Sequence, residues 1–267
     1  MRKPNILKQK LKKGESCIGA WSVMPSASVT NVMGAAGFDF VIIDLEHGPM
    51  SYETAEDMTR ALESEQCTPL IRVPCNDGPT ILRALEIGTH GVVVPQIADA
   101  KQAQAVIQSA KYAPIGNRGM SVFTRASGYY AAGQKGRTDK ENNETLVVVL
   151  VEGVEGIKNL DAIIEVGHID VIYIGTYDLS QSLGISDNVN SPKVIEAVEQ
   201  CAKKIRNKGI AAGVLAQTED DVNRWLEMGI QFIPYMVDCA IFHQACSTIV
   251  NNFKSKVDTR WVEKLSH

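Results

Sequence analysis

Short apolar runs rich in β-branched residues alternate along the chain with segments whose apolar residues recur at helical spacing. Eight runs have the length and composition of buried strands: 18–24, 40–47, 69–74, 91–97, 145–152, 171–178, 211–217 and 231–237. Eight segments of helical character follow them in turn: 26–36, 51–66, 79–87, 98–111, 154–166, 191–208, 219–228 and 239–253. This alternation predicts βαβ units and a parallel sheet.

Glycine closes five of the helical segments just before the next strand, in AAGF, EIGTHG, EVGH, NKGI and EMGI. Glycine readily adopts the left-handed C-cap that turns a chain back towards its next strand. An open doubly wound sheet shares the alternation, but no G-x-G-x-x-G sequence follows the first strand. Eight units in residues 1–267 therefore predict a single-domain (β/α)8 barrel, also called a TIM barrel, which typically takes about 250 residues.

Three segments fall outside the repeating units. Residues 1–13 are basic and polar and are predicted to form a short capping helix. The long loop at 112–144 exceeds the usual link between helix and strand, and such loops commonly serve as lids or interface arms. We expect it to cross a barrel mouth, its own or a neighbour's. We expect the C-terminal tail at 251–267 to follow the eighth helix and to pack on another surface, which in an oligomer could belong to another subunit.

Charge and cysteine content narrow the class of protein. The net charge is −4 without a run of like charges, which argues against nucleic acid or an anionic membrane as partner. Six cysteines lack C-x-x-C spacing, no signal-peptide pattern opens the chain, and no apolar run approaches the roughly 20 residues that span a bilayer. We expect a cytoplasmic metabolic protein with reduced thiols.

Functional residues of parallel barrels project from the carboxyl ends of the strands. Those ends offer Asp44, Glu46, His47, Arg72, Gln96, Glu152 and Asp178. Glu152 or Asp178 alone could be an ordinary helix N-cap or first-turn acid. Two carboxylates that converge from adjacent strands are costly unless a positive charge neutralises them, so the combination with an arginine and a histidine predicts a site.

Two carboxylates without a Cys/His cluster suit a hard divalent cation that keeps water or substrate in its other positions. Mg²⁺ is the expected ion, Mn²⁺ or Co²⁺ could substitute, and closed tetrahedral zinc is disfavoured. The stretch GTYDLS at 175–180 places backbone amides at a helix start, where a carboxylate can bind. Together with Arg72, these features predict a small-molecule 2-oxo acid as ligand.

Five segments carry a family resemblance: FDFVIIDLEHGP, PLIRVP, YAPIGNRG, VEGVEGIKNLDAI and YIGTYDLSQSLG. In this order, from about Gly19 to Phe253, they resemble the HpcH/HpaI family of metal-dependent class II pyruvate aldolases. The resemblance implies a barrel of the phosphoenolpyruvate/pyruvate-binding type, usually a hexamer. It also implies cleavage of a 4-hydroxy-2-oxo acid to pyruvate and an aldehyde through a metal-stabilised pyruvate enolate.

Roles follow from the matching positions. The resemblance implies that Glu152 and Asp178 hold the metal, that Arg72 stabilises the enolate, and that His47 is the general base. Substrate carboxylate binding falls to the turn of Gly175, Thr176, Tyr177 and Asp178, and Asp44 lies in the catalytic D-x-E-H-x-P element. No lysine ends a strand, which argues against a Schiff-base aldolase.

Glu86 matches a family aspartate credited with raising the basicity of the catalytic histidine. It ends the third helical segment, so it should lie at the barrel end away from the site. We therefore expect a homo-oligomer, in the resemblance a hexamer, in which Glu86 of one chain approaches His47 of another.

The chain departs from the family pattern at three places. Leu150 replaces a glutamine, Thr176 and Tyr177 replace a G-P-x-D pattern, and Glu86 is one methylene longer than aspartate. We hypothesise that Gln96 supplies the amide missing at Leu150; the alternative is that it bonds a loop backbone. Two other functions stay open: an acyl-CoA lyase like the citrate lyase β-chain, and an oxo-acid-binding protein without turnover.

Overall fold

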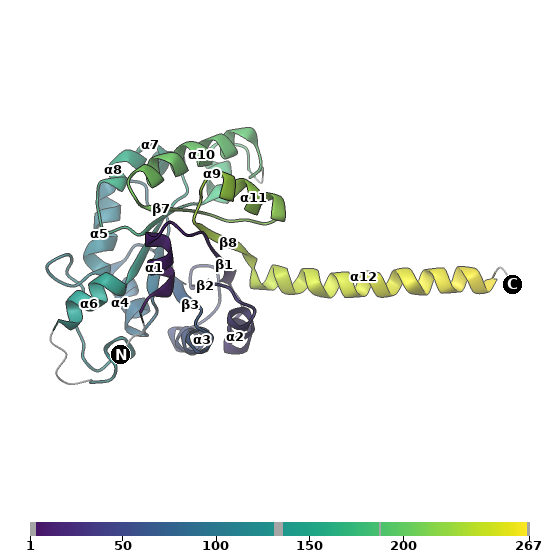
Figure 1. Cartoon of the computed structure of the whole chain (residues 1–267), viewed down its shortest axis with the longest axis horizontal. Helices are drawn as coiled ribbons and strands as arrows, with labels where there is room; N and C mark the ends of the chain where they lie inside the picture. Colours follow the sequence, from purple (N-terminus) through teal and green to yellow (C-terminus); the bar gives the residue numbers. More distant parts are fainter. Residues whose placement is uncertain (1–3, 131–135, 187, 266–267) are drawn as a thin grey trace.

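The computed structural model describes residues 4–130, 136–186 and 188–265. Its eight parallel strands form a closed barrel in sequence order, each pairing with the next and the last with the first (Figure 1). The strands are β1 Cys17–Ser22, β2 Phe40–Asp44, β3 Thr68–Arg72, β4 Gly91–Val94, β5 Leu146–Val151, β6 Val171–Ile174, β7 Ala211–Val214 and β8 Phe232–Val237. The predicted (β/α)8 barrel is confirmed.

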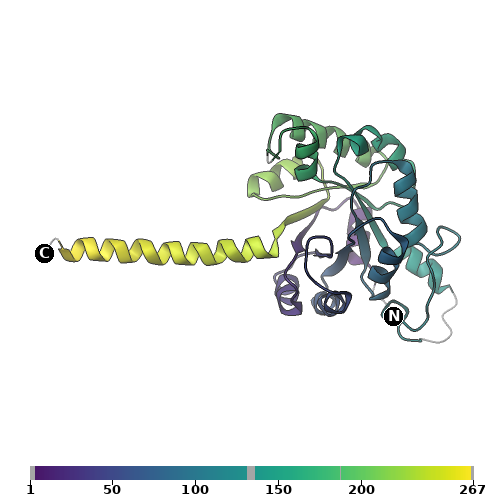
Figure 2. The same cartoon turned by 180° about the vertical axis from the view of Figure 1, so that it is seen from behind.

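Helices surround the barrel (Figures 1 and 2). They are α1 Ile6–Lys12, α2 Ala27–Ala35, α3 Tyr52–Ser64, α4 Gly78–Glu86, α5 Ala100–Ala110, α6 Arg137–Glu144, α7 Val154–Lys158, α8 Leu160–Ile164, α9 Thr176–Ser182, α10 Pro192–Asn207, α11 Glu219–Glu227 and α12 Asp238–Leu265, with a 3-10 turn η1 at Arg125–Ser127. The predicted helix at 154–166 divides at Asn159, whose side chain donates to the carbonyl of Ala98.

Two apolar cores hold the barrel together. Inside it, side chains from alternate strand positions fill the interior, where the rings of Phe40 and Phe232 stack 4.1 Å apart. Outside it, aliphatic side chains of the strands pack against the helices. Because both faces of most strands are buried, these strands read as continuous apolar runs.

The predicted strands mostly run past the residues at which the structure ends them. The second was expected to reach His47, and the sixth to reach Asp178, but they end at Asp44 and Ile174. Residues beyond these ends form the loops at the barrel mouth, and 176–182 form α9 instead of strand. The expected strand-end residues therefore lie on the rim, where they can face a ligand.

The described parts of the long segment, residues 112–130 and 136–144, lie at the amino-terminal end of the barrel. Lys111, just before it, donates to the carbonyls of Asn142 and Thr145 at 2.8 and 2.7 Å, and Arg125 pairs with Glu63 of α3. None of its described residues lines the cavity at the opposite end. The segment connects the end of α5 to the start of β5, and both lie at the amino-terminal end of the barrel. It therefore does not cross the carboxyl-terminal mouth of its own barrel, where the cavity lies.

The last helix leaves the barrel. α12 begins directly after β8 and continues through most of the predicted tail at 251–267, projecting away from the rest of the chain (Figures 1 and 2). The expected end of the helix at residue 253 is therefore wrong, and residues 266 and 267 lie outside the described part. None of the described helices combines the length and apolar composition that a membrane crossing requires.

Candidate active site

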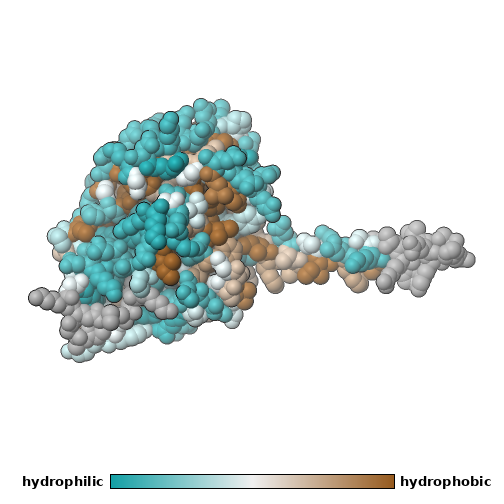
Figure 3. Space-filling view, in the orientation of Figure 1, coloured by the Kyte–Doolittle hydropathy of each residue, from teal (hydrophilic) through white to brown (hydrophobic). Residues whose placement is uncertain are grey.

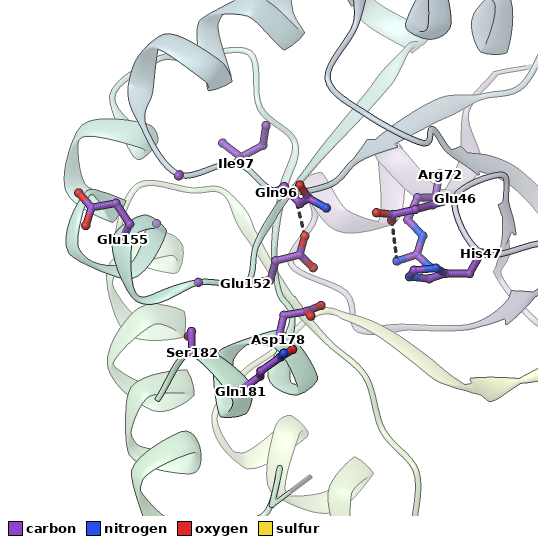
Figure 4. Close-up of a pocket in the computed structure, with 13 residues that line it drawn as sticks. Glu46, His47, Arg72, Gln96, Ile97, Glu152, Glu155, Asp178, Gln181 and Ser182 are labelled. Atoms are coloured by element: carbon purple, nitrogen blue, oxygen red, sulfur yellow. Dashed lines mark hydrogen bonds and ion pairs between the residues drawn. The ribbon is translucent and has the colours of Figure 1, made fainter. Parts of the chain in front are cut away.

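Two adjoining hollows open at the carboxyl ends of the strands and share His47, Arg72, Glu152 and Asp178. The first, here the polar lobe, measures about 430 Å³ and is shown in Figure 4. It is completed by Glu46, Gln96, Ile97, Ala98, Gly153, Glu155, Gly156, Gln181 and Ser182. The second, here the aromatic lobe, measures about 280 Å³. It is completed by Trp21, Leu150, Tyr173, Gly175, Thr176, Tyr177, Leu215 and Val237.

Arg72 is fixed from three sides. Its Nε donates to Asp44 Oδ1 at 2.8 Å and its Nη2 to Asp44 Oδ2, while Nη1 lies 3.2 Å from Glu46 Oε2. The ring of Trp21 lies 4.3 Å from the guanidinium carbon. Burial works against the charge, but the hydrogen bond to Asp44 and the charges of Asp44 and Glu46 outweigh it and raise the pKa of Arg72. The arginine therefore stays a fixed cation.

Asp44 also holds the loop that follows β2. Its Oδ1 accepts the backbone N–H groups of Glu46 and His47 at 3.0 and 3.2 Å. This carboxylate is buried and lines neither lobe, so it positions Arg72 and His47 without facing a ligand. His47 itself is exposed at the mouth and lines both lobes, and within the described ranges no side chain hydrogen-bonds its ring.

Glu152 is held at the end of β5 by one backbone donor. Gln96, whose φ of +58° places it in the left-handed region, donates its N–H to Glu152 Oε1 at 2.7 Å (Figure 4). Burial, with smaller contributions from the charges of Asp178 and Glu46, raises the pKa of Glu152 to about 7. The hydrogen bond from Gln96 and the charge of Arg72 oppose this rise only in part.

Asp178 faces Glu152 across the cavity from the first turn of α9 (Figure 4). The turn approaches β5 closely at Gly175: a Cβ there would lie 2.6 Å from the Cβ of Glu152 and 2.9 Å from its Oε2. Glycine is therefore required for the two carboxylates to converge. The first amides of a helix have no acceptor within it, so the turn at 176–178 presents N–H groups at the lobe.

The two carboxylates fit a divalent cation. The charge of Asp178 adds to the cost of ionising Glu152, and a cation between the two carboxylates would remove that cost. No cluster of three or more Asp, Glu, His and Cys side chains with metal-site geometry occurs in 4–130, 136–186 and 188–265. A cation here would take the remaining ligands from water or substrate, which Mg²⁺ commonly does and a closed zinc site does not.

The residues that depart from the family pattern fall mainly in the aromatic lobe. Leu150 is buried and faces the barrel interior beside Tyr173, its partner in the β5–β6 register. Thr176 is buried, whereas Tyr177 is half exposed and its hydroxyl accepts a hydrogen bond from Gln217 at 2.5 Å. Gln96 lines the polar lobe beside Glu152, and its contact with a bound 2-oxo acid stays a prediction.

Glu86 lies apart from the other predicted site residues. It ends α4 at the amino-terminal side of the barrel, where its Oε1 pairs with the buried Arg118 at 2.7 Å. Its Oε2 is buried and has no hydrogen-bond partner among the residues described. The structure of one chain therefore does not bring Glu86 to His47.

Several lining residues escaped the prediction. Glu46 was noticed at its strand end but given no role, although it contacts Arg72. Trp21, Tyr173, Leu215 and Val237 are apolar or aromatic, so their sequence pattern matches that of core residues. Of these four, Trp21 could have been found from the sequence, because it lies near the carboxyl end of the first strand, where site residues project.

Comparisons with known proteins identify the family of the chain. The profile of the family described as HpcH/HpaI aldolase/citrate lyase matches residues 18–245. A "5-keto-4-deoxy-D-glucarate aldolase" of Enterobacter sp. (strain 638) is 32% identical over 251 residues, covering 94% of this chain and 97% of the relative.

Two solved structures have the same fold. One described as citrate synthase SbnG has 28% identity and a TM-score of 0.85, over 94% of this chain and 98% of that one. The HpcH/HpaI aldolase of Desulfitobacterium hafniense DCB-2 has 24% identity and a TM-score of 0.87, over 93% and 96%. Since the family profile spans the barrel from β1 into α12, the chain belongs to the HpcH/HpaI aldolase/citrate lyase family of enzymes.

Proposed function

We propose that this enzyme is a divalent-metal-dependent class II aldolase that cleaves a 4-hydroxy-2-oxo acid to pyruvate and an aldehyde. The single observation that carries the proposal is the pair of Glu152 and Asp178 facing Arg72 and His47 across one cavity (Figure 4). The family and its aldolase relatives support the reaction type.

The 2-oxo acid binds with its carboxylate at the free amides of 176–178 and its 2-oxo oxygen towards Arg72. These groups meet in the aromatic lobe, whose apolar side chains Leu150, Leu215 and Val237 suit the carbon chain of the substrate. The cation is held by Glu152 and Asp178, and Mg²⁺ is the expected ion. When bound, it supplies Lewis-acid polarisation of the 2-oxo group.

His47 is the proposed general base. It lines both lobes, so it can take the proton of the 4-hydroxyl group as the bond between C3 and C4 breaks. The electron pair of that bond passes to the pyruvate half, where negative charge grows on the 2-oxo oxygen beside Arg72. Return of a proton to C3 then completes pyruvate, and the aldehyde leaves.

The test combines metal binding with turnover. Calorimetric titration of metal-free protein with Mn²⁺ should show one site per chain, and Glu152→Gln and Asp178→Asn should each abolish it. The same variants should lose aldol addition of pyruvate to a panel of aldehydes, with Glu155→Gln as the exposed control on the same lobe. Unchanged Mn²⁺ affinity in both variants would overturn the metal assignment. Turnover of acetyl-CoA instead of aldehydes would favour the acyl-CoA lyase.

We also propose that the enzyme is a homo-oligomer, with the hexamer of the resemblance as the expected state. α12 exposes Phe242, Ile249 and Phe253, each more than 60% accessible, and apolar surface follows the helix from the barrel (Figure 3). Large apolar side chains exposed together on a projecting helix indicate an interface. A second copy would also be needed for Glu86 to approach a His47 ring, because within one chain Glu86 ends α4 at the amino-terminal side of the barrel, away from the site.

A reducing compartment, and so the cytoplasm, is the proposed location. All six cysteines are unpaired, and Cys75, Cys239 and Cys246 are exposed. Exposed free thiols persist where the cell keeps them reduced.

A further inference from the structure

One buried tyrosine lies at the floor of the aromatic lobe and has no part in the reaction as described above. Tyr173 is only 4% exposed and lines the lobe from β6. Its ring crosses the barrel interior over Gly213 of β7, where an added Cβ would lie 3.0 Å from its Cδ2. It meets Trp21 of β1 edge to face, with ring centroids 5.9 Å apart. The phenol is thus placed by packing from both sides.

The Tyr173 hydroxyl still has a hydrogen to donate. The indole of Trp21 packs beside the phenol, and because an indole nitrogen can only donate, it cannot take up the phenol hydrogen. No acceptor for the phenol hydrogen occurs in the part of the chain that the structure describes. Burial raises the pKa of Tyr173 well above that of an ordinary tyrosine, so the group remains a neutral donor.

The surroundings of the hydroxyl point to a ligand in the lobe. The groups whose charges act on it are Arg72, Glu152 and Tyr177, and all three line the aromatic lobe. Its neighbour in the strand register, Leu150, is apolar and offers no hydrogen-bonding group. Among the described residues the hydroxyl is not one of the fully buried polar atoms that lack a partner, so it is open to the lobe, where an acceptor oxygen on a bound substrate can take its hydrogen bond.

We propose that Tyr173 is a specificity-determining residue whose hydroxyl donates a hydrogen bond to an oxygen of the bound 2-oxo acid. The proposal rests on the proposed function, because it needs the acid in the aromatic lobe. It differs from that function in that the metal ligands, Arg72 and His47 could all act without it. The interaction selects ligands that present an acceptor oxygen at the floor of the lobe.

The experiment compares Tyr173→Phe with the wild type by calorimetric titration of pyruvate at saturating Mn²⁺. Loss of one hydrogen bond should weaken pyruvate binding about tenfold. Mn²⁺ affinity should be unchanged, and in turnover the KM for pyruvate should rise more than kcat falls. Tyr52→Phe is the matched control, since Tyr52 lies outside both lobes.

The outcomes separate this proposal from the proposed function. Wild-type pyruvate affinity in Tyr173→Phe would overturn the role of Tyr173 and leave the aldolase untouched. Failure of the wild-type protein to bind pyruvate with Mn²⁺ would overturn the proposed function as well. A crystal of the wild-type complex is the second measurement. The proposal requires Tyr173 Oη within about 3.2 Å of a pyruvate oxygen, and a longer separation refutes it.

Discussion

Glu152→Gln should stabilise the metal-free protein at alkaline pH while destroying its metal site. The wild-type carboxyl has its pKa raised from 4.5 to about 7 by burial and by Asp178. At about 1.4 kcal/mol per pKa unit, ionising it in the folded protein costs about 3 kcal/mol. Glutamine removes this cost but weakens the bond from the Gln96 N–H by about 1 kcal/mol. The expected net gain is about 2 kcal/mol.

The sign of the pH dependence follows from the direction of the shift. The unfolded carboxyl loses its proton near pH 4.5, whereas the folded one keeps it until about pH 7. The stability that the proton on Glu152 contributes is fully present below pH 4.5, the unfolded pKa, and is lost as the pH rises through the folded pKa of about 7. The variant should therefore match the wild type at about pH 5 and exceed its Tm by about 4–8 °C at about pH 8.

Thermal unfolding in excess chelator, at one fixed protein concentration, measures the difference in Tm between variant and wild type at each of the two pH values. Glu199→Gln, an exposed glutamate on α10, controls for the loss of a negative charge. Added Mn²⁺ should reverse the order, because a cation at about 100 times its Kd stabilises the wild type by about 2.7 kcal/mol and the variant has no site for it. A Glu152→Gln Tm at or below that of the wild type in chelator at alkaline pH would refute the electrostatic reasoning.

The other predictions concern turnover and assembly. Arg72→Lys keeps the charge but loses the bidentate grip on Asp44, so kcat should fall by about 10²-fold or more, and a near-normal kcat in a steady-state assay would contradict the transition-state role. Phe253→Asp should lower the mass seen by light scattering, whereas its neighbour Lys254→Ala should not; an unchanged mass in Phe253→Asp would exclude α12 from the interface. If Glu86 acts through His47 of another chain, kcat/KM of Glu86→Gln combined with His47→Asn should equal that of His47→Asn alone, while additive losses would separate the two residues.

The closed barrel and most of the site could be predicted because both depend on local patterns. Buried parallel strands require continuous apolar runs, so a carboxylate at the end of such a run, as at Glu152, identifies a rim position without any structure. The strand ends themselves were less predictable. Apolar residues such as Leu215 continue past the last residue of the strand, because they line the lobe.

The parts that escaped prediction depend on contacts distant in sequence. The aromatic residues at the floor of the lobe have the sequence pattern of core residues. Every second residue of a strand points into the barrel, whether it contacts a ligand there or only other side chains. The short α9 lies inside a run of strand-forming residues and is fixed by the approach of Gly175 to Glu152. The direction of α12 cannot be read from its own residues, because a projecting helix and a docked one share the same helical pattern.

The carboxylate of Asp44 accepts four donors: two from the Arg72 guanidinium and one each from the backbones of Glu46 and His47. The two sides of the cavity, one around Asp44 and Arg72 and the other around Glu152 and Asp178, are therefore held by different numbers of hydrogen bonds. The half around Asp44 is set before any ligand arrives, so a substrate meets it with little reorganisation. In the opposite half, Glu152 accepts one hydrogen bond, from the Gln96 N–H, and the charge of Asp178 opposes its ionisation. If the proposed function holds, this half can adjust to the radius of the bound cation without disturbing Arg72 and His47, which lie in the other half.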